Sequence, residues 1–154
     1  EYIRIKQENK IMKNAKFIII FSLFAIALTA CGSAPVALPS TYPDAAVQVE
    51  VIALNHAPIR PAVEEVEALV AEYGEKAGYT RYDFDTDAGK AFAEKYGIDS
   101  HTPIAIYING EDEFEINGMV TKFYSFPQDG GTGIVASGTW TMDDLRTVLD
   151  QETN

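Results

Sequence analysis

Residues 47–73, VQVEVIALNHAPIRPAVEEVEALVAEY, predict a buried strand that leads through a turn into a helix. Val47–Leu54 is β-branched and mostly apolar, as expected of a central strand covered on both faces. Pro58 and Pro61 frame the turn, and Pro61 suits the first turn of a helix, where its missing N–H is not needed. From Ala62 to Tyr73, apolar residues recur at helical spacing, which indicates one buried face.

The chain after this helix predicts a second strand and a second helix. Tyr79–Phe84 has the alternation of a strand. Thr86 or Asp87 can cap a helix that runs to Tyr96, and Gly97 supplies its stop.

Three more strands are predicted towards the end of the chain. Ile104–Ile108 is followed by Asn109-Gly110, a strong hairpin signal. Phe114–Ile116 and Met119–Phe126 have the pattern of further strands, joined by a second turn at Asn117-Gly118.

A glycine-rich loop at residues 127–133 precedes the last helix, which Thr141 can cap together with Asp144. The order of elements is strand, helix, strand, helix, strands, helix. This order predicts an α/β fold, a mixed sheet with helices on its faces.

The start of the chain predicts an export signal rather than structure. Residues 12–31, MKNAKFIIIFSLFAIALTAC, combine two lysines, a 12-residue apolar run and small residues before Cys31. A membrane-spanning helix needs roughly 20 apolar residues. The ending resembles the bacterial lipobox, which implies that Cys31 carries the lipid and that the protein is anchored in the bacterial cell envelope, outside the cytoplasmic membrane. An ordinary cleaved signal is the alternative, and Met12 is the expected start.

These signals divide the chain into three parts. Residues 1–30 form an N-terminal extension and lipoprotein signal peptide, residues 31–46 a lipidated proline-rich tether, and residues 47–154 one folded domain. Five of the 12 basic residues and two of the 23 acidic ones precede Cys31, so the mature chain has seven basic and 21 acidic residues and a net charge of −14. Such a surface repels phosphate backbones, so we expect no nucleic-acid partner, and contact with the bilayer only through the acyl chains.

Three stretches of the domain together resemble the thioredoxin superfamily. VEVIALNHAPIRPAVEEVEALVAEYG is similar to the family's first strand, active-site turn and first long helix. AEKYGIDSHTPIAIYINGE resembles the segment that leads through the cis-proline to the next strand and turn, and GTWTMDDLRTVLDQ resembles the final helix. The resemblance covers residues 47–154 and implies a three-layer α/β/α fold with a central mixed sheet and an extra β insertion before the last helix.

The redox cysteines of that family are missing here. Where thioredoxins have tryptophan, cysteine, glycine, proline, cysteine, residues 55–59 read Asn-His-Ala-Pro-Ile. Disulfide exchange requires attack by a thiolate, which His56 and Ile59 cannot provide. Glu50 stands where the family has a buried carboxylate near its cysteines, and without thiols its proton-handling role has no substrate. We therefore expect no redox activity and no cofactor. No recognisable catalytic motif is present, and the sequence neither supports nor excludes an enzyme activity of another type.

The resemblance also implies a binding groove. Pro103 matches the family's cis-proline, with a register offset of one residue, and its loop faces the active-site turn. The groove residues are expected to hold an extended peptide by strand pairing; they are Asn55, His56, Pro58, His101, Thr102 and Pro103.

A second hypothesis concerns metal. Both histidines, His56 and His101, fall on these two loops, and together they could hold copper or zinc. Two ligands are too few for a closed site, so Asp99, Glu50 or water would have to complete it. The alternative is that both are ordinary exposed loop residues.

Overall fold

The computed structural model describes residues 40–99, 102–128 and 138–154. The predicted signal, Cys31, His101 and most of the glycine-rich loop lie outside these residues. No helix in the described part of the chain is long and apolar enough to cross a membrane.

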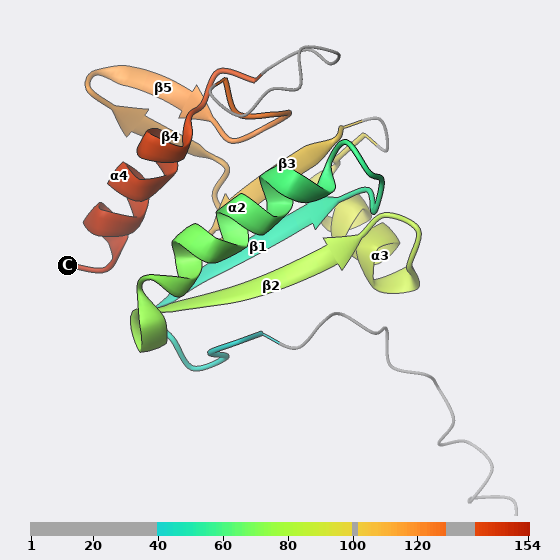
Figure 1. The fold of residues 1–154 in the computed structure, drawn as a ribbon, viewed down its shortest axis with the longest axis horizontal. Helices are drawn as coiled ribbons and strands as arrows, with labels where there is room; N and C mark the ends of the chain where they lie inside the picture. The colour runs from blue at the N-terminus through green and yellow to red at the C-terminus, as the bar shows by residue number, and fades with distance from the viewer. Residues whose placement is uncertain (1–39, 100–101, 129–137) are drawn as a thin grey trace, which may run out of the picture. The chain divides into compact units, whose positions relative to one another are not determined.

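The fold is mixed α/β, built on a three-stranded mixed sheet of order β2-β1-β3 (Figure 1). β1 (Val47–Ala53) lies in the centre, parallel to β2 (Ala77–Asp83) and antiparallel to β3 (Ile104–Ile108). The three predicted strands are therefore confirmed. β1 is covered on both faces, as its mostly apolar sequence predicts, with Gln48 and Glu50 half-buried.

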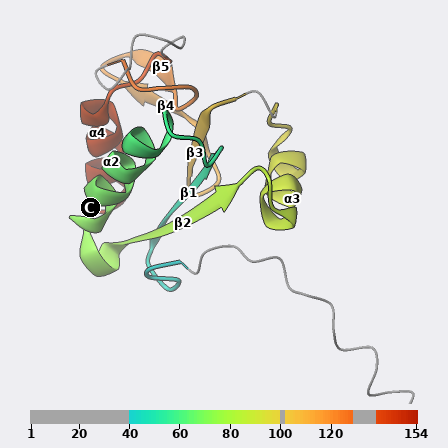
Figure 2. The ribbon, with the colours of Figure 1, turned by 45° about the vertical axis from the view of Figure 1, so that its right-hand side comes forward.

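Two helices cover one face of the sheet (Figure 2). α2 (Arg60–Ala71) begins just before Pro61 and is followed by a short 3₁₀ turn, η1 (Gly74–Lys76). α4 (Met142–Glu152) begins with the predicted capping box, since Thr141 and Asp144 satisfy each other's backbone N–H groups. The core between these helices and the sheet includes Val49, Val51, Val63, Val66, Ile106, Leu145 and Leu149.

A third helix, α3 (Asp87–Tyr96), covers the opposite face (Figure 2). The hydroxyl of Thr86 accepts the N–H of Gly89, so Thr86 is the cap. Gly97 ends the helix with φ = 65°, a left-handed conformation in which glycine avoids the steric cost of a Cβ. Phe92 of α3 packs with Ile52, Ala105 and Tyr107 of the sheet.

The remaining strands form a separate hairpin of β4 (Glu113–Ile116) and β5 (Met119–Lys122). Its turn at Asn117-Gly118 has φ values of 53° and 80°, as the sequence predicts for a two-residue hairpin loop. The predicted strand Met119–Phe126 is too long. It ends at Lys122, which pairs with Glu113, the first residue of β4, and Ser125, with φ = 67°, departs from the extended backbone.

The chain beyond β5 returns to the sheet and supplies core residues. The Ile106 N–H donates to the carbonyl of Phe123, and the Ser125 N–H donates to the carbonyl of Ile104. Trp140 is fully buried and donates its indole N–H to the carbonyl of Tyr124 at 3.1 Å. Phe123 and Trp140 are therefore core residues.

The folded part begins before the predicted boundary at Val47. The Thr41 N–H donates to the carbonyl of Tyr79 at 3.1 Å. The side-chain amide of Gln48 donates to the carbonyls of Tyr42 and Ala45, at 3.1 and 2.8 Å. Residues 41–46, which the sequence places in the tether, are thus bonded to the domain.

Candidate functional site

The turn after β1 and the loop before β3 lie at the same end of the sheet. Ala53 pairs with Ile104 of β3 and also with Asp83 of β2. The residues that follow Ala53 and those that precede Ile104 therefore meet at the carboxyl end of two parallel strands, where ligands of open α/β sheets usually bind. We call residues 54–59 together with Thr102 and Pro103 the β1-end surface.

The turn at residues 55–58 presents its side chains to solvent. Asn55, His56 and Pro58 are all exposed. The carbonyl of His56 accepts the N–H of Ile59 at 3.0 Å and that of Arg60 at 3.1 Å, which closes the turn directly onto α2. His56 is therefore held by its backbone while its imidazole stays accessible.

Ile59 faces the other way, into the core between the sheet and α2, with only 5% of its surface exposed. It occupies the position that the thioredoxin resemblance aligns with the second cysteine. A butyl side chain buried here anchors the turn by packing and offers no reactive atom to a ligand.

The resemblance leaves open whether the peptide bond before Pro103 is cis, as it is in the family, and the structure has a trans bond there. Peptide bonds in the described part of the chain are all trans, including Thr102–Pro103. The Thr102 N–H donates to the carbonyl of Asp99 at 2.9 Å, so the chain already turns before Pro103 and enters β3 without a cis bond. Thr102 and Pro103 are half-buried, and the N–H of Thr102 is not free to pair with a peptide.

His101 lies outside the described residues, so its distance from His56 is not defined. Within residues 40–99, 102–128 and 138–154, no three histidine, cysteine or carboxylate side chains gather closely enough to hold a metal. No observation on the described residues thus favours the metal hypothesis.

Glu50 lies on the α3 face of the sheet, beside tyrosines. It is half-buried and accepts a hydrogen bond from the hydroxyl of Tyr82 at 3.0 Å. Burial and, after it, this carboxylate raise the pKa of Tyr82 to about 12. Glu50 is therefore bonded to Tyr82, and residues 40–99, 102–128 and 138–154 contain no cysteine near which it could act.

Sequence reasoning missed an aromatic cluster on this same face. Tyr82 stacks on Phe92 at 4.3 Å between ring centroids, and Tyr96 stacks on Tyr107 at 4.1 Å. The hydroxyls of Tyr107 and Tyr124 lie 2.7 Å apart. The signal was the four-residue spacing of Phe92 and Tyr96 on a helix, together with Tyr82 and Tyr107 on the same face of the two strands that flank β1.

Comparison with family models, with curated proteins and with solved structures gives no match for this chain. Its function is therefore inferred from its own residues.

Proposed function

We propose that this chain is a lipid-anchored, extracytoplasmic binding module of thioredoxin-like fold that has no thiol–disulfide activity. The layers support the fold: α2 and α4 cover one face of the mixed sheet and α3 the other, and the β4–β5 hairpin lies where an insertion before the last helix is expected.

The cysteine content supports the absence of redox chemistry. Cys31 is the only cysteine of the chain, and the lipobox pattern assigns its sulfur to the lipid. His56 and Ile59 replace the reactive pair, and neither can form a mixed disulfide. The mature protein is expected to reduce insulin disulfides no faster than buffer does, and measurable turnover contradicts the proposal.

The single observation that carries the binding function is the pairing of Ala53 with Ile104, which places the exposed turn beside the Pro103 loop. We expect an extended peptide to contact the accessible side chains of Asn55 and His56. Because the Thr102 N–H already donates to Asp99, specificity rests on these side chains more than on backbone pairing at Thr102.

A blocking substitution tests this surface. Ala57→Trp fills the space beside His56, and Ala68→Trp is its matched control, since both alanines are exposed and Ala68 lies on α2. The full chain in an uncharged detergent is applied to an array of short unstructured peptides. Binding that Ala57→Trp removes and Ala68→Trp preserves supports the proposal; binding that both variants preserve places the peptide site elsewhere.

The anchor is tested independently by mass spectrometry of the membrane-extracted protein. A diacylglyceryl group on Cys31 as the first residue is the expected finding. An unmodified sulfhydryl on a protein recovered from the aqueous fraction contradicts it.

A further inference from the structure

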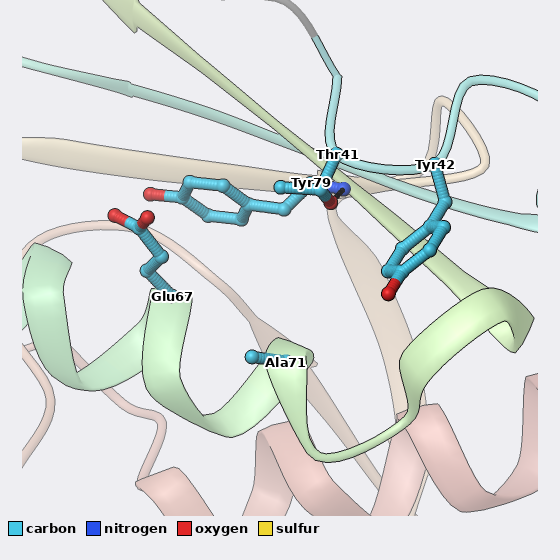
Figure 3. Close-up of a pocket in the computed structure, with 5 residues that line it drawn as sticks. All are labelled: Thr41, Tyr42, Glu67, Ala71 and Tyr79. Atoms are coloured by element: carbon cyan, nitrogen blue, oxygen red, sulfur yellow. Dashed lines mark hydrogen bonds between the residues drawn. The ribbon is translucent and has the colours of Figure 1, made fainter.

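A second candidate site lies away from the β1-end surface, where the start of the folded part crosses the edge of the sheet. A pocket of about 340 Å³ opens between residues 41–42, β2 and α2. Its lining is Thr41, Tyr42, Glu67, Ala71 and Tyr79 (Figure 3).

The pocket is held open by backbone contacts rather than by side chains alone. The carbonyl of Tyr79 accepts the N–H of Thr41. The N–H of Tyr79 in turn donates to the hydroxyl of Thr41 at 3.1 Å. Gly78 allows this approach, because a Cβ at that position would lie 2.3 Å from the carbonyl oxygen of Tyr42. The backbone of Tyr42 is thereby held against β2, and Tyr42 is 40% exposed. A pocket fixed in this way loses little entropy when a ligand enters.

The walls combine aromatic rings with one charge. The phenol rings of Tyr42 and Tyr79 and the methyl group of Ala71 supply the apolar surface, and Glu67 supplies a carboxylate. Figure 3 shows the hydroxyl end of Tyr79 and the carboxylate of Glu67 on the same side of the pocket. No lysine, arginine or histidine is among the five lining residues, so Glu67 is the one charge of the lining. Arg81 of β2 does not line the pocket, but its positive charge also acts on the Tyr79 hydroxyl.

One buried polar group at this pocket has no protein partner. Tyr79 is 5% exposed, and its hydroxyl makes no hydrogen bond to any residue in the described part of the chain. Burial and then the charge of Glu67 raise the pKa of Tyr79, and the charge of Arg81 lowers it by less, so the hydroxyl stays neutral. The pocket therefore carries the negative charge of Glu67 and the negative faces of two aromatic rings.

We propose that this pocket binds an alkylammonium group, such as that of choline, either as a free amine or as part of a larger headgroup. A substituted ammonium is attracted to the faces of the tyrosine rings and to a carboxylate, and it has apolar methyl groups that match Ala71. An anion would be repelled by Glu67. A neutral apolar ligand would leave that carboxylate without a partner.

Calorimetric titration of the full chain in an uncharged detergent, with choline chloride and with glycerophosphocholine as probes, tests the proposal. Glu67→Gln is expected to weaken binding by about two- to fivefold, the range of an exposed ion pair. Glu65→Gln removes the same charge from an exposed position of α2 that does not line the pocket, and it should leave the affinity unchanged. Tyr42→Ala should weaken binding by about two- to fivefold, while Tyr42→Phe keeps the ring and the affinity.

In 3,3-dimethyl-1-butanol a neutral carbon replaces the ammonium nitrogen of choline. This probe separates recognition of the cation from filling of the pocket by an apolar group. We expect it to bind more weakly than choline. Binding of glycerophosphocholine as well as choline identifies a site that accepts a lipid headgroup, and binding of choline alone identifies a site for the free amine. Absence of binding by both probes, equal binding of dimethylbutanol, or insensitivity to either Glu67→Gln or Tyr42→Ala overturns the proposal.

Discussion

Thr41 and Tyr79 are joined by two hydrogen bonds, both 3.1 Å long, in which each backbone N–H donates to the other residue. On the outer edge of β2, the Tyr79 N–H donates to the hydroxyl of Thr41, so a side chain takes the place of a strand carbonyl there. Residues 41–46 thus cover part of an edge that would otherwise present unpaired backbone groups.

Replacing Thr41 by valine tests the hydrogen bond from the Tyr79 N–H to the Thr41 hydroxyl. Thr41→Val keeps the shape of the side chain but removes the acceptor for the N–H of Tyr79, a buried residue. We expect a loss of about 0.5–1.5 kcal/mol in the free energy of unfolding, the net contribution of one hydrogen bond, because this bond is only partly buried. Urea denaturation measures it, and hydrogen exchange at the Tyr79 amide should accelerate. Thr41→Ser retains a hydroxyl and should stay close to the wild type; equal stability of all three proteins contradicts the prediction.

Gly78→Ala tests how closely the two segments approach. The added Cβ would lie 2.3 Å from the carbonyl oxygen of Tyr42, a backbone atom that cannot rotate away. Residues 41–46 must then shift, at a cost of about 1–3 kcal/mol, as for overpacking in a core. Thermal unfolding measures the loss. An unchanged midpoint means that this segment does not pack on β2 as described.

Tyr79→Phe is expected to stabilise the protein. The hydroxyl of Tyr79 is buried and has no hydrogen-bond partner in the described part of the chain. Removing an unsatisfied buried group is expected to raise the free energy of unfolding by about 1 kcal/mol. The backbone bonds to Thr41 remain, so the change isolates the hydroxyl. A destabilised variant in urea denaturation shows instead that the hydroxyl has a partner, such as ordered water.

Local sequence signals predicted the elements of this fold because each depends on a few adjacent residues. The caps at Thr86 and Thr141, the stop at Gly97 and the turn at Asn117-Gly118 all act through the backbone of their own segment. What the sequence did not predict depends on contacts between distant segments. The packing of Tyr42 beside Gly78 and the trans bond before Pro103 are of this kind.

The two candidate sites also differ in whether they depend on local or on distant residues. Exposure of His56 followed from its place in a proline-framed turn, whereas the pocket beside Glu67 requires three segments to meet. A family resemblance could suggest the first site but not the second, because residues 41–42 precede the segment that carries the resemblance.

The contact between Tyr82 and Glu50 predicts a loss of stability in alkali. An unperturbed tyrosine ionises near pH 10, whereas burial and the Glu50 carboxylate raise the pKa of Tyr82 to about 12 in the folded protein. Between these values the unfolded chain releases a proton that the folded protein retains. The contribution of Tyr82 to the free energy of unfolding is therefore fully present below pH 10 and is lost as the pH rises towards 12. Urea denaturation across this interval should show a shallower fall for Tyr82→Phe, which has no proton to release.

Glu50→Gln removes the charge that disfavours the phenolate, so its fall should also be shallower than that of the wild type. If Tyr82→Phe declines as steeply as the wild type, Tyr82 is not responsible for the alkaline loss.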